Sequence, residues 1–397
     1  MKIYTTKKDV ASAKLIVADD MFLTKDMPTA AGSKMLDGYM SLFEAEVLTR
    51  LCDKGYALGG KADVGEFAFD LIGETSYNGA CVADGKLISA SAAILNADEA
   101  MATLNMDVNG SVRRAAAQSG LVSVKPTYGT VSRFGTVPVA CSGETVSVMS
   151  KTADGCREIL DAIAGHDDKD GTSLPESTCA QVKSAPAVRR VALLTSMTKG
   201  ADAEVMAKLE AFKSALTAAD VEVCEIDDSV ICSSRVAWNI LMSAELCNNV
   251  SRYDGVKYGY RAQNFSGIDE LYTNSRTEAF GELLKTTILF GSETLSTENY
   301  MKVYDKALRT RRVIVEAFAK IFESFDAVLM PACSTMSYTE ADVNANKYLV
   351  FEENFYTAPA SITGLPAVVC NSVQLVGPAF SELSLLDLAA KCAKEGK

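Results

Sequence analysis

Histidine is almost absent from this chain. The 397-residue sequence contains a single histidine, His166. A serine or cysteine nucleophile that used imidazole as its base would therefore have to use this one residue. His166 lies in the run Ala164-Gly165-His166-Asp167-Asp168, which is typical of a helix end, where glycine stops the helix and a cation is favourable. We therefore expect any serine chemistry here to need lysine or another group as its base.

The sequence also lacks paired cysteines. Its 11 cysteines are scattered singly from Cys52 to Cys392, without a C-x-x-C motif. This distribution is typical of reduced, mostly buried thiols in a cytosolic protein. With one histidine and no cysteine cluster, we expect no metal site. Neither a G-x-x-x-x-G-K-[ST] loop nor a G-x-G-x-x-G turn is present, so we expect no nucleotide and no other cofactor.

Basic residues and long apolar runs are also scarce. The chain has 39 Lys and Arg against 51 Asp and Glu, which gives a formal net charge of −12. Because nucleic-acid affinity comes largely from basic surface, we expect no direct nucleic-acid binding, and any RNA would be contacted by a partner. No apolar run approaches the length that crosses a bilayer, and the first residues lack the apolar region of a signal peptide. The sequence thus predicts a cytoplasmic protein that does not contact a membrane.

The pattern of apolar residues predicts an α/β fold in one domain, 1–397. Two β-α-β units are expected, with strands at 14–18 and 55–61 around a helix at 38–54, and strands at 190–194 and 221–226 around a helix at 202–218. Residues 171–189 are predicted to be a surface connection, and 230–325 to be mostly helical, with breaks at 254–255 and Gly291. The remaining predictions are helices at 89–104, 111–120, 152–164 and 381–393, and strands at 121–125, 327–331, 365–369 and 372–376.

Ser111 is the first candidate functional residue. It directly follows the small polar turn Asn109-Gly110 and opens an alanine-rich helical run. The turn, comprising Val108, Asn109 and Gly110, can bring backbone N–H groups and a helix dipole to a developing oxyanion. Two interpretations are open: Ser111 is a nucleophile, or it is simply the N-cap of the helix. A base elsewhere in the chain would favour the first.

Several further motifs resemble the amidase signature family. They are the run Gly120-Leu121-Val122-Ser123-Val124-Lys125-Pro126-Thr127-Tyr128-Gly129, Arg133-Phe134-Gly135, and Ile163-Ala164-Gly165-His166-Asp167. The run from Ser251 to Arg261 is similar to the A subunits of tRNA-dependent glutamine amidotransferases within that family. The resemblance extends from about Leu15 to the C-terminus. It implies a large mixed β-sheet covered by helices on both faces.

The resemblance also implies a chemistry. In this family a lysine acts as base through a bridging serine, and a second serine attacks an amide and becomes acylated. Ser111 matches the nucleophile, with Asp107, Gly110 and Arg113 retained around it. The position of the lysine matches Ala18, and that of the bridging serine matches Leu87. Asn109 replaces a glycine of the nucleophile turn. Two members of the triad are therefore missing, and no motif places Lys86, Lys25 or Lys14 as a substitute base.

The substrate-binding positions are only partly retained. The glutamine-using subunits hold the amino-acid end of glutamine with a Tyr, an Arg and an Asp. Tyr260 and Arg311 match the first two, although Arg311 lies in a basic helical run that is equally typical of a solvated surface. The Asp is matched by Asn354, and losing its charge would weaken contact with an α-ammonium group.

Two hypotheses follow from the sequence. The first is a catalytically impaired pseudo-amidase with a structural, regulatory or binding role, as a partner of amidotransferase-like B and C subunits or as a module that binds a small amide or amino acid. The second is an active amidase or glutaminase that supplies ammonia to a tRNA-dependent amidotransferase through Ser111, with an unidentified base.

Overall fold

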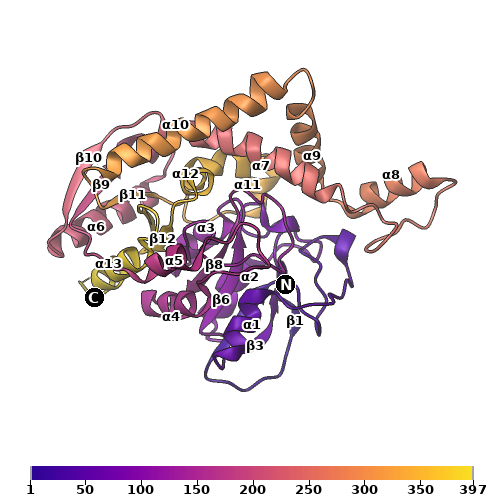
Figure 1. Cartoon of the computed structure of the whole chain (residues 1–397), viewed down its shortest axis with the longest axis horizontal. Coiled ribbons are helices and arrows are strands. Elements are labelled where there is room, and N and C mark those ends of the chain that lie inside the picture. Colours follow the sequence, from indigo (N-terminus) through magenta and orange to yellow (C-terminus); the bar gives the residue numbers. More distant parts are fainter. Residues whose placement is uncertain (1, 396–397) are drawn as a thin grey trace.

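The computed structural model describes residues 2–395 and is built around one mixed sheet of 11 strands (Figure 1). The strand order is β1-β3-β2-β6-β8-β7-β12-β13-β11-β9-β10, and β4 and β5 form a separate hairpin. The strands are β1 (Tyr4–Lys7), β2 (Leu15–Asp19), β3 (Ala57–Ala62), β4 (Val82–Ala83), β5 (Lys86–Leu87), β6 (Ala102–Asp107), β7 (Val122–Lys125), β8 (Thr145–Ser150), β9 (Arg190–Leu194), β10 (Glu222–Ile226), β11 (Ala327–Pro331), β12 (Ala367–Cys370) and β13 (Val373–Val376).

Helices pack on both faces of this sheet, as the resemblance implied. They are α1 (Glu46–Asp53), α2 (Ala90–Asn96), α3 (Ser111–Ser119), α4 (Ala153–Ile163), α5 (Glu176–Cys179), α6 (Ala203–Ala218), α7 (Ser234–Val250), α8 (Ile268–Ala279), α9 (Glu282–Thr294), α10 (Asp305–Phe322), α11 (Glu340–Ala345), α12 (Leu349–Thr363) and α13 (Glu382–Glu395). Figure 1 shows α8 projecting away from the rest of the molecule. Within residues 2–395, no helix is both long and apolar enough to cross a membrane.

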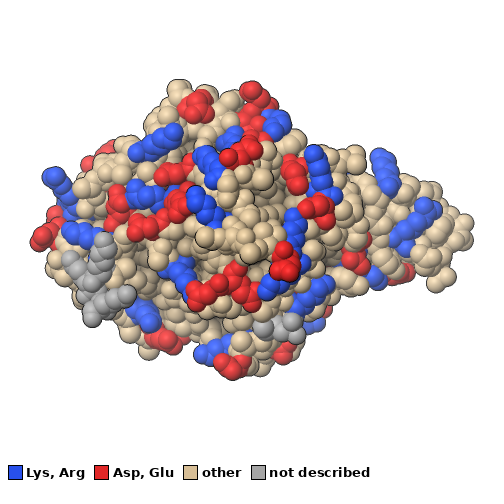
Figure 2. Space-filling view, turned by 90° about the horizontal axis from the view of Figure 1, so that it is seen from below, with Lys and Arg blue, Asp and Glu red and all other residues tan. Residues whose placement is uncertain are grey.

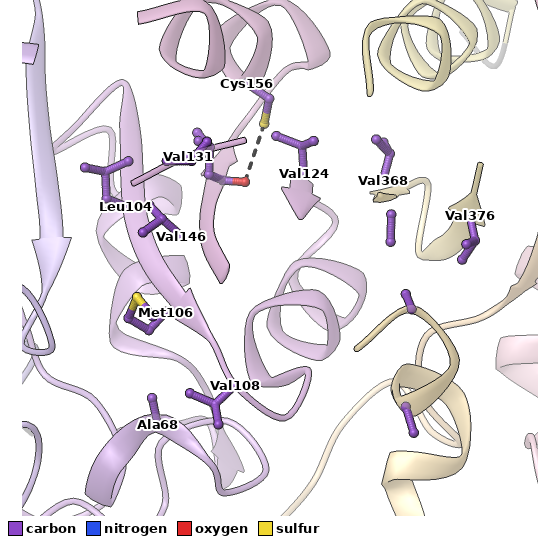
Figure 3. Close-up of a cluster of buried hydrophobic side chains, with 14 of the residues drawn as sticks. Ala68, Leu104, Met106, Val108, Val124, Val131, Val146, Cys156, Val368 and Val376 are labelled. Atoms are coloured by element: carbon purple, nitrogen blue, oxygen red, sulfur yellow. Dashed lines mark hydrogen bonds between the residues drawn. The ribbon is translucent and has the colours of Figure 1, made fainter. Parts of the chain in front are cut away.

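The alternation of side chains along β8 and β12 explains why both faces are covered. Val148 and Val368 belong to the large buried cluster that includes Cys156 of α4. Their neighbours Met149 and Val369 belong to a second cluster, which includes alanines of α3. Successive side chains of a strand point to opposite faces, so each strand contributes to two layers of core. Figure 3 shows part of the larger cluster, with side chains from β6, β7, β8, β12 and β13.

Three predicted elements differ from the structure. The helix expected over 89–104 ends at Asn96, and residues 102–107 form β6 instead. All six residues of β6 are buried, although the sequence from Ala102 to Asp107 alternates between apolar and polar residues, and the strand lies directly after an alanine-rich run that favours a helix. The helix expected to start at residue 38 begins at Glu46. Gly291 does not break a helix: it lies inside α9, where an added Cβ would be 2.0 Å from the Ser243 carbonyl oxygen of α7. This glycine permits two helices to approach closely.

Other segments were simply not predicted. β1, β8 and the β4–β5 hairpin were absent from the sequence interpretation, and the connection 171–189 contains the short helix α5 and a 3-10 turn at Ala180–Lys183.

Charged groups of both signs are interspersed over the face of the molecule drawn in Figure 2.

Candidate functional site

Three neighbouring strands end at the same edge of the sheet. β2 pairs in parallel with both β3 and β6, so their carboxyl ends lie together. Asp19 ends β2, Asp63 directly follows β3, and Asp107 ends β6. The carboxyl ends of parallel strands are a common place for a site because the loops that follow them diverge and leave a crevice.

The turn that carries Ser111 is held by a buried ion pair. Asp107 Oδ1 accepts a hydrogen bond from the Gly110 backbone N–H at 3.0 Å, and Asp107 Oδ2 accepts one from Arg113 Nε at 2.8 Å. Both side chains of this pair are fully buried. The carboxylate thus fixes the turn from one side, and the guanidinium fixes the carboxylate. These contacts bring together Asp107, Gly110 and Arg113, the residues that the resemblance matched around Ser111.

Ser111 is the first residue of α3, and the residue that caps this helix is Gly110, with φ +86°. No side chain caps the helix, so the interpretation of Ser111 as an N-cap is wrong. Ser111 is partly exposed, and in the described part of the chain its Oγ makes no hydrogen bond. The backbone N–H groups of Val108 and Asn109 likewise donate to no other group between residues 2 and 395. Both residues are buried, and neither lines the cavity that Ser111 borders.

The side chain of Asn109 fills the space beside this turn. Its Nδ2 donates to the Phe69 carbonyl oxygen at 2.8 Å, and its Oδ1 accepts from Trp238 Nε1 at 3.0 Å. Asn109 and Trp238 are both buried. A glycine at position 109 would lack both hydrogen bonds, so the asparagine connects the Ser111 turn to Phe69 and to α7.

A narrow cavity lies on the other side of Ser111. The volume open to the centre of a water molecule is about 20 Å³, which is room for little more than one water. The cavity is lined mainly by carboxylates, hydroxyls and one amide, from Asp19, Asp63, Asp70, Ser89, Ser91, Asn105 and Ser111. This lining, within residues 2–395, contains no lysine and no histidine.

The residues that the sequence matched to the family's lysine and bridging serine do not border this cavity. Ala18 is fully buried, and the strand residue that does line the cavity is its neighbour Asp19. Leu87 is buried in the β4–β5 hairpin, where its N–H donates to the Tyr338 carbonyl oxygen, whereas Ser89 and Ser91 line the cavity.

The lysines of the chain are placed elsewhere. Lys14, Lys25 and Lys86, the possible substitute bases, are all exposed and do not line the cavity. Two buried lysines were not considered from the sequence. Lys61 donates to Thr29 Oγ1 and to the Pro28 carbonyl oxygen. Lys125 donates to the Leu365 and Pro126 carbonyl oxygens, and burial lowers its pKa to about 7. Neither lines the Ser111 cavity.

The acids of the cavity have raised pKa values. Burial raises the pKa of Asp19 to about 7, even though the backbone N–H groups of Met106 and Met21 favour its ionised form. Burial also raises the pKa of Asp63, and burial together with the nearby Glu74 raises that of Asp70. Close to neutral pH, the group beside Ser111 is therefore a carboxyl that is partly protonated, and not an amine.

A nearby buried acid gives a test of this electrostatic picture. Burial raises the pKa of Glu66 to about 7, and Glu66 accepts hydrogen bonds from Ser33 Oγ and from the Gly281 N–H. Because the folded state keeps a proton that the unfolded state releases above about pH 4.5, the stability that this proton supplies is lost as pH rises towards 7. The loss amounts to about 3 kcal/mol at pH 8.

Glu66→Gln cannot ionise; its amide oxygen can accept from the Gly281 N–H, and its NH2 group can donate to Ser33 Oγ. We therefore expect this variant to gain melting temperature relative to the unaltered protein as pH rises from 5 to 8. Thermal unfolding at several pH values measures this difference. The control is Glu340→Gln on the exposed first turn of α11, which makes the same change of charge at the surface. A Glu66→Gln difference that is constant across this range would contradict the prediction.

The three substrate-binding candidates lie in different surroundings. Asn354 is next to the Ser111 turn: its side-chain amide lies 2.8–3.3 Å from that of Asn109 and 2.6 Å from Asn239 Oδ1. Arg311 Nη2 donates to the Ser142 carbonyl oxygen at 3.1 Å. Tyr260 donates its hydroxyl proton to Glu278, and Lys34 lies over its ring. None of these three residues lines the Ser111 cavity.

The cavity also contains residues that sequence reasoning missed. Asp19, Asp63, Asp70 and Asn105 come from separate loops and strands, and no motif connects them. A signal was present only for Asp19 and Asp63, which each follow a predicted strand. No group of three or more metal-ligating side chains is found within residues 2–395.

Comparisons with known proteins give a consistent result. The pattern of the amidase family matches residues 16–386. The A subunit of the glutamyl-tRNA(Gln) amidotransferase from Coxiella burnetii (strain RSA 493 / Nine Mile phase I) is 33% identical over 400 residues, which cover 96% of this chain and 83% of that protein. Its counterpart from Lachnoclostridium phytofermentans is 35% identical over 365 residues, covering 89% of this chain and 74% of that protein.

Solved structures show the same fold. The A subunit of the glutamyl-tRNA(Gln) amidotransferase from Thermotoga maritima superposes with a TM-score of 0.81 at 23% identity, covering 100% of this chain and 87% of that one. A 6-aminohexanoate cyclic dimer hydrolase superposes with a TM-score of 0.78 at 16% identity, covering 96% of this chain and 84% of that one.

Proposed function

Because the chain belongs to the amidase family, we propose that it takes the place of the A subunit beside amidotransferase-like B and C subunits, without hydrolysing amides at Ser111. Its role there is structural, regulatory or ligand-binding. The similarity to curated A subunits over most of their length supports the assembly. The ten cysteines from Cys52 to Cys370 are free thiols, which supports action in the reducing cytoplasm.

One observation carries the proposal for Ser111. The group that lines its cavity at the end of β2 is the carboxyl of Asp19, where a serine nucleophile of this type needs a basic amine. Ser111 Oγ has no hydrogen-bonded partner within residues 2–395 that could accept its proton. A serine without a base is a poor nucleophile at neutral pH. The small cavity further restricts the approach of an amide.

The retained turn supports a second candidate, a working amidase or glutaminase that feeds ammonia to a transamidation partner. Gly110 and Asp107 keep their hydrogen bond, and within residues 2–395 the N–H groups of Val108 and Asn109 donate to no other group. Asp19, with a pKa of about 7, would then have to act as the base.

Ammonia release separates the two candidates. The purified chain is incubated with glutamine, asparagine and simple amides, and ammonia is measured with Ser111→Ala as the matched control. We expect the two proteins to release ammonia at the same background rate, because the unaltered Ser111 lacks a base. Turnover that disappears in Ser111→Ala would establish the second candidate instead.

A further inference from the structure

A second, larger pocket opens within the helical layer, between α7, α9 and the start of α12. The volume open to the centre of a water molecule is about 440 Å³, within the range of small-molecule sites. Its walls are mostly apolar and aromatic, with Phe290 of α9 facing Tyr348 and Phe351. The rings of Tyr348 and Phe351 are stacked, with centroids 6.5 Å apart. The pocket shares no lining residue with the Ser111 cavity.

Arg235 is the single charged residue among the residues that line this pocket. It is only partly exposed, and between residues 2 and 395 it makes no ion pair and no hydrogen bond through its guanidinium. Glu352 and Glu353 border an adjoining hollow that Arg235 also lines. Their carboxylates are engaged elsewhere: Glu353 accepts from Tyr338 Oη and the Ser334 N–H, and Glu352 accepts from Asn346.

An unpaired, partly buried guanidinium beside aromatic walls fits one class of ligand. Its planar donors match a carboxylate in bidentate geometry, and removal from water strengthens that contact. The aromatic walls provide the apolar surface that a ligand body needs. We propose that this pocket binds a small carboxylate with an apolar or aromatic body. This binding does not depend on whether Ser111 reacts.

The pocket is linked to the Ser111 turn through side-chain amides. Asn239, which lines the pocket, lies 2.6 Å from the Asn354 side chain, and Asn354 contacts Asn109. The next residue towards the start of α7, Trp238, donates to Asn109 Oδ1. Trp238 is the only tryptophan in the chain, so its fluorescence reports on the wall between the pocket and the turn.

The probe pair 4-phenylbutyrate and 4-phenylbutanamide tests the proposal, because the two differ only in the carboxylate. Calorimetry gives the affinities, and Trp238 fluorescence reports where the probe binds. We expect 4-phenylbutyrate to bind at least about ten-fold more tightly than the amide and to change the emission of Trp238. Arg235→Met should remove the preference, whereas Arg309→Met, at an exposed arginine of α10, should keep it.

A second variant, which fills the pocket, separates loss of binding from loss of folded structure in Arg235→Met. Val236 is exposed and lines the pocket, so Val236→Trp should abolish binding of both probes with little change in melting temperature. Because this variant adds a second tryptophan, its binding is measured by calorimetry alone. Equal affinity for the two probes, no binding of either up to the solubility limit, or binding of 4-phenylbutyrate that survives both Arg235→Met and Val236→Trp would overturn the proposal.

Discussion

Gly110→Ala is expected to lower the free energy of unfolding by about 2–5 kcal/mol. Gly110 has φ +86°, a conformation that costs an alanine about 1–2 kcal/mol. An added Cβ would also lie 2.3 Å from Thr357 Cβ of α12, and overpacking of this kind costs about 1–3 kcal/mol. Thr357 cannot easily move away, because its Oγ1 donates a hydrogen bond to the Asn109 carbonyl oxygen and accepts one from Arg114 Nη1. Urea-induced unfolding measures the change.

Gly120→Ala is the matched control for this prediction. Gly120 ends the same helix, α3, also with positive φ (+67°), but nothing lies within 4 Å of an added Cβ. Gly120→Ala should therefore cost about 1–2 kcal/mol of stability for the backbone conformation, with no added cost from steric overlap. If Gly110→Ala and Gly120→Ala lowered the free energy of unfolding equally, close packing of the Ser111 turn against α12 would not be the cause of the loss in Gly110→Ala.

Arg113→Met is expected to cost about 3–5 kcal/mol, because it leaves the Asp107 carboxylate buried and unpaired. Arg113 is fully buried and donates to both oxygens of Asp107. Its remaining donors reach the Thr357 carbonyl oxygen, Ser361 Oγ and Gln374 Oε1, and so connect the Ser111 turn to α12 and β13. The loss should appear in the urea midpoint and in the melting temperature.

The control is Arg312→Met on α10. Arg312 is exposed, and among the residues that the structure describes it pairs only with Glu316, one turn further along the helix. Exposed pairs of this kind contribute about 0.3–0.5 kcal/mol, so this variant should be close to the unaltered protein. A loss below about 1 kcal/mol in Arg113→Met would mean that the retained Asp107–Arg113 pair does not hold the turn.

Much of the fold could be predicted because its signals are local. The helix at 202–218 has an Asp cap and an apolar stripe, and the structure places α6 at Ala203–Ala218. The strands at 190–194 and 327–331 are short, mostly apolar runs, the strand at 221–226 is rich in β-branched and apolar residues with two glutamates between them, and each is present. β6 was missed although its residues alternate between apolar and polar, because it lies directly after an alanine-rich run that favours a helix.

The site could be predicted less completely than the fold. Ser111 and its turn were found because Asp107, Gly110 and Arg113 are close in the sequence. Asp19 was not identified as a cavity residue. Whether Asp19 or its neighbour Ala18 faces the cavity depends on the register of β2 against β6. A shift of one residue reverses the two faces. Asp63, Asp70 and Asn105 meet Ser111 only through tertiary packing, to which no local pattern corresponds.

The central claim is that Ser111 is not activated, and labelling by a fluorophosphonate tests it most directly, because such a probe reacts with activated serines whatever their substrate. The protein is incubated with the probe at several pH values from 6 to 9, and adducts are located by intact and peptide mass spectrometry, with Ser111→Ala as control. We expect no adduct at Ser111 at any of these pH values. A stoichiometric adduct at Ser111, absent from Ser111→Ala, would contradict the claim.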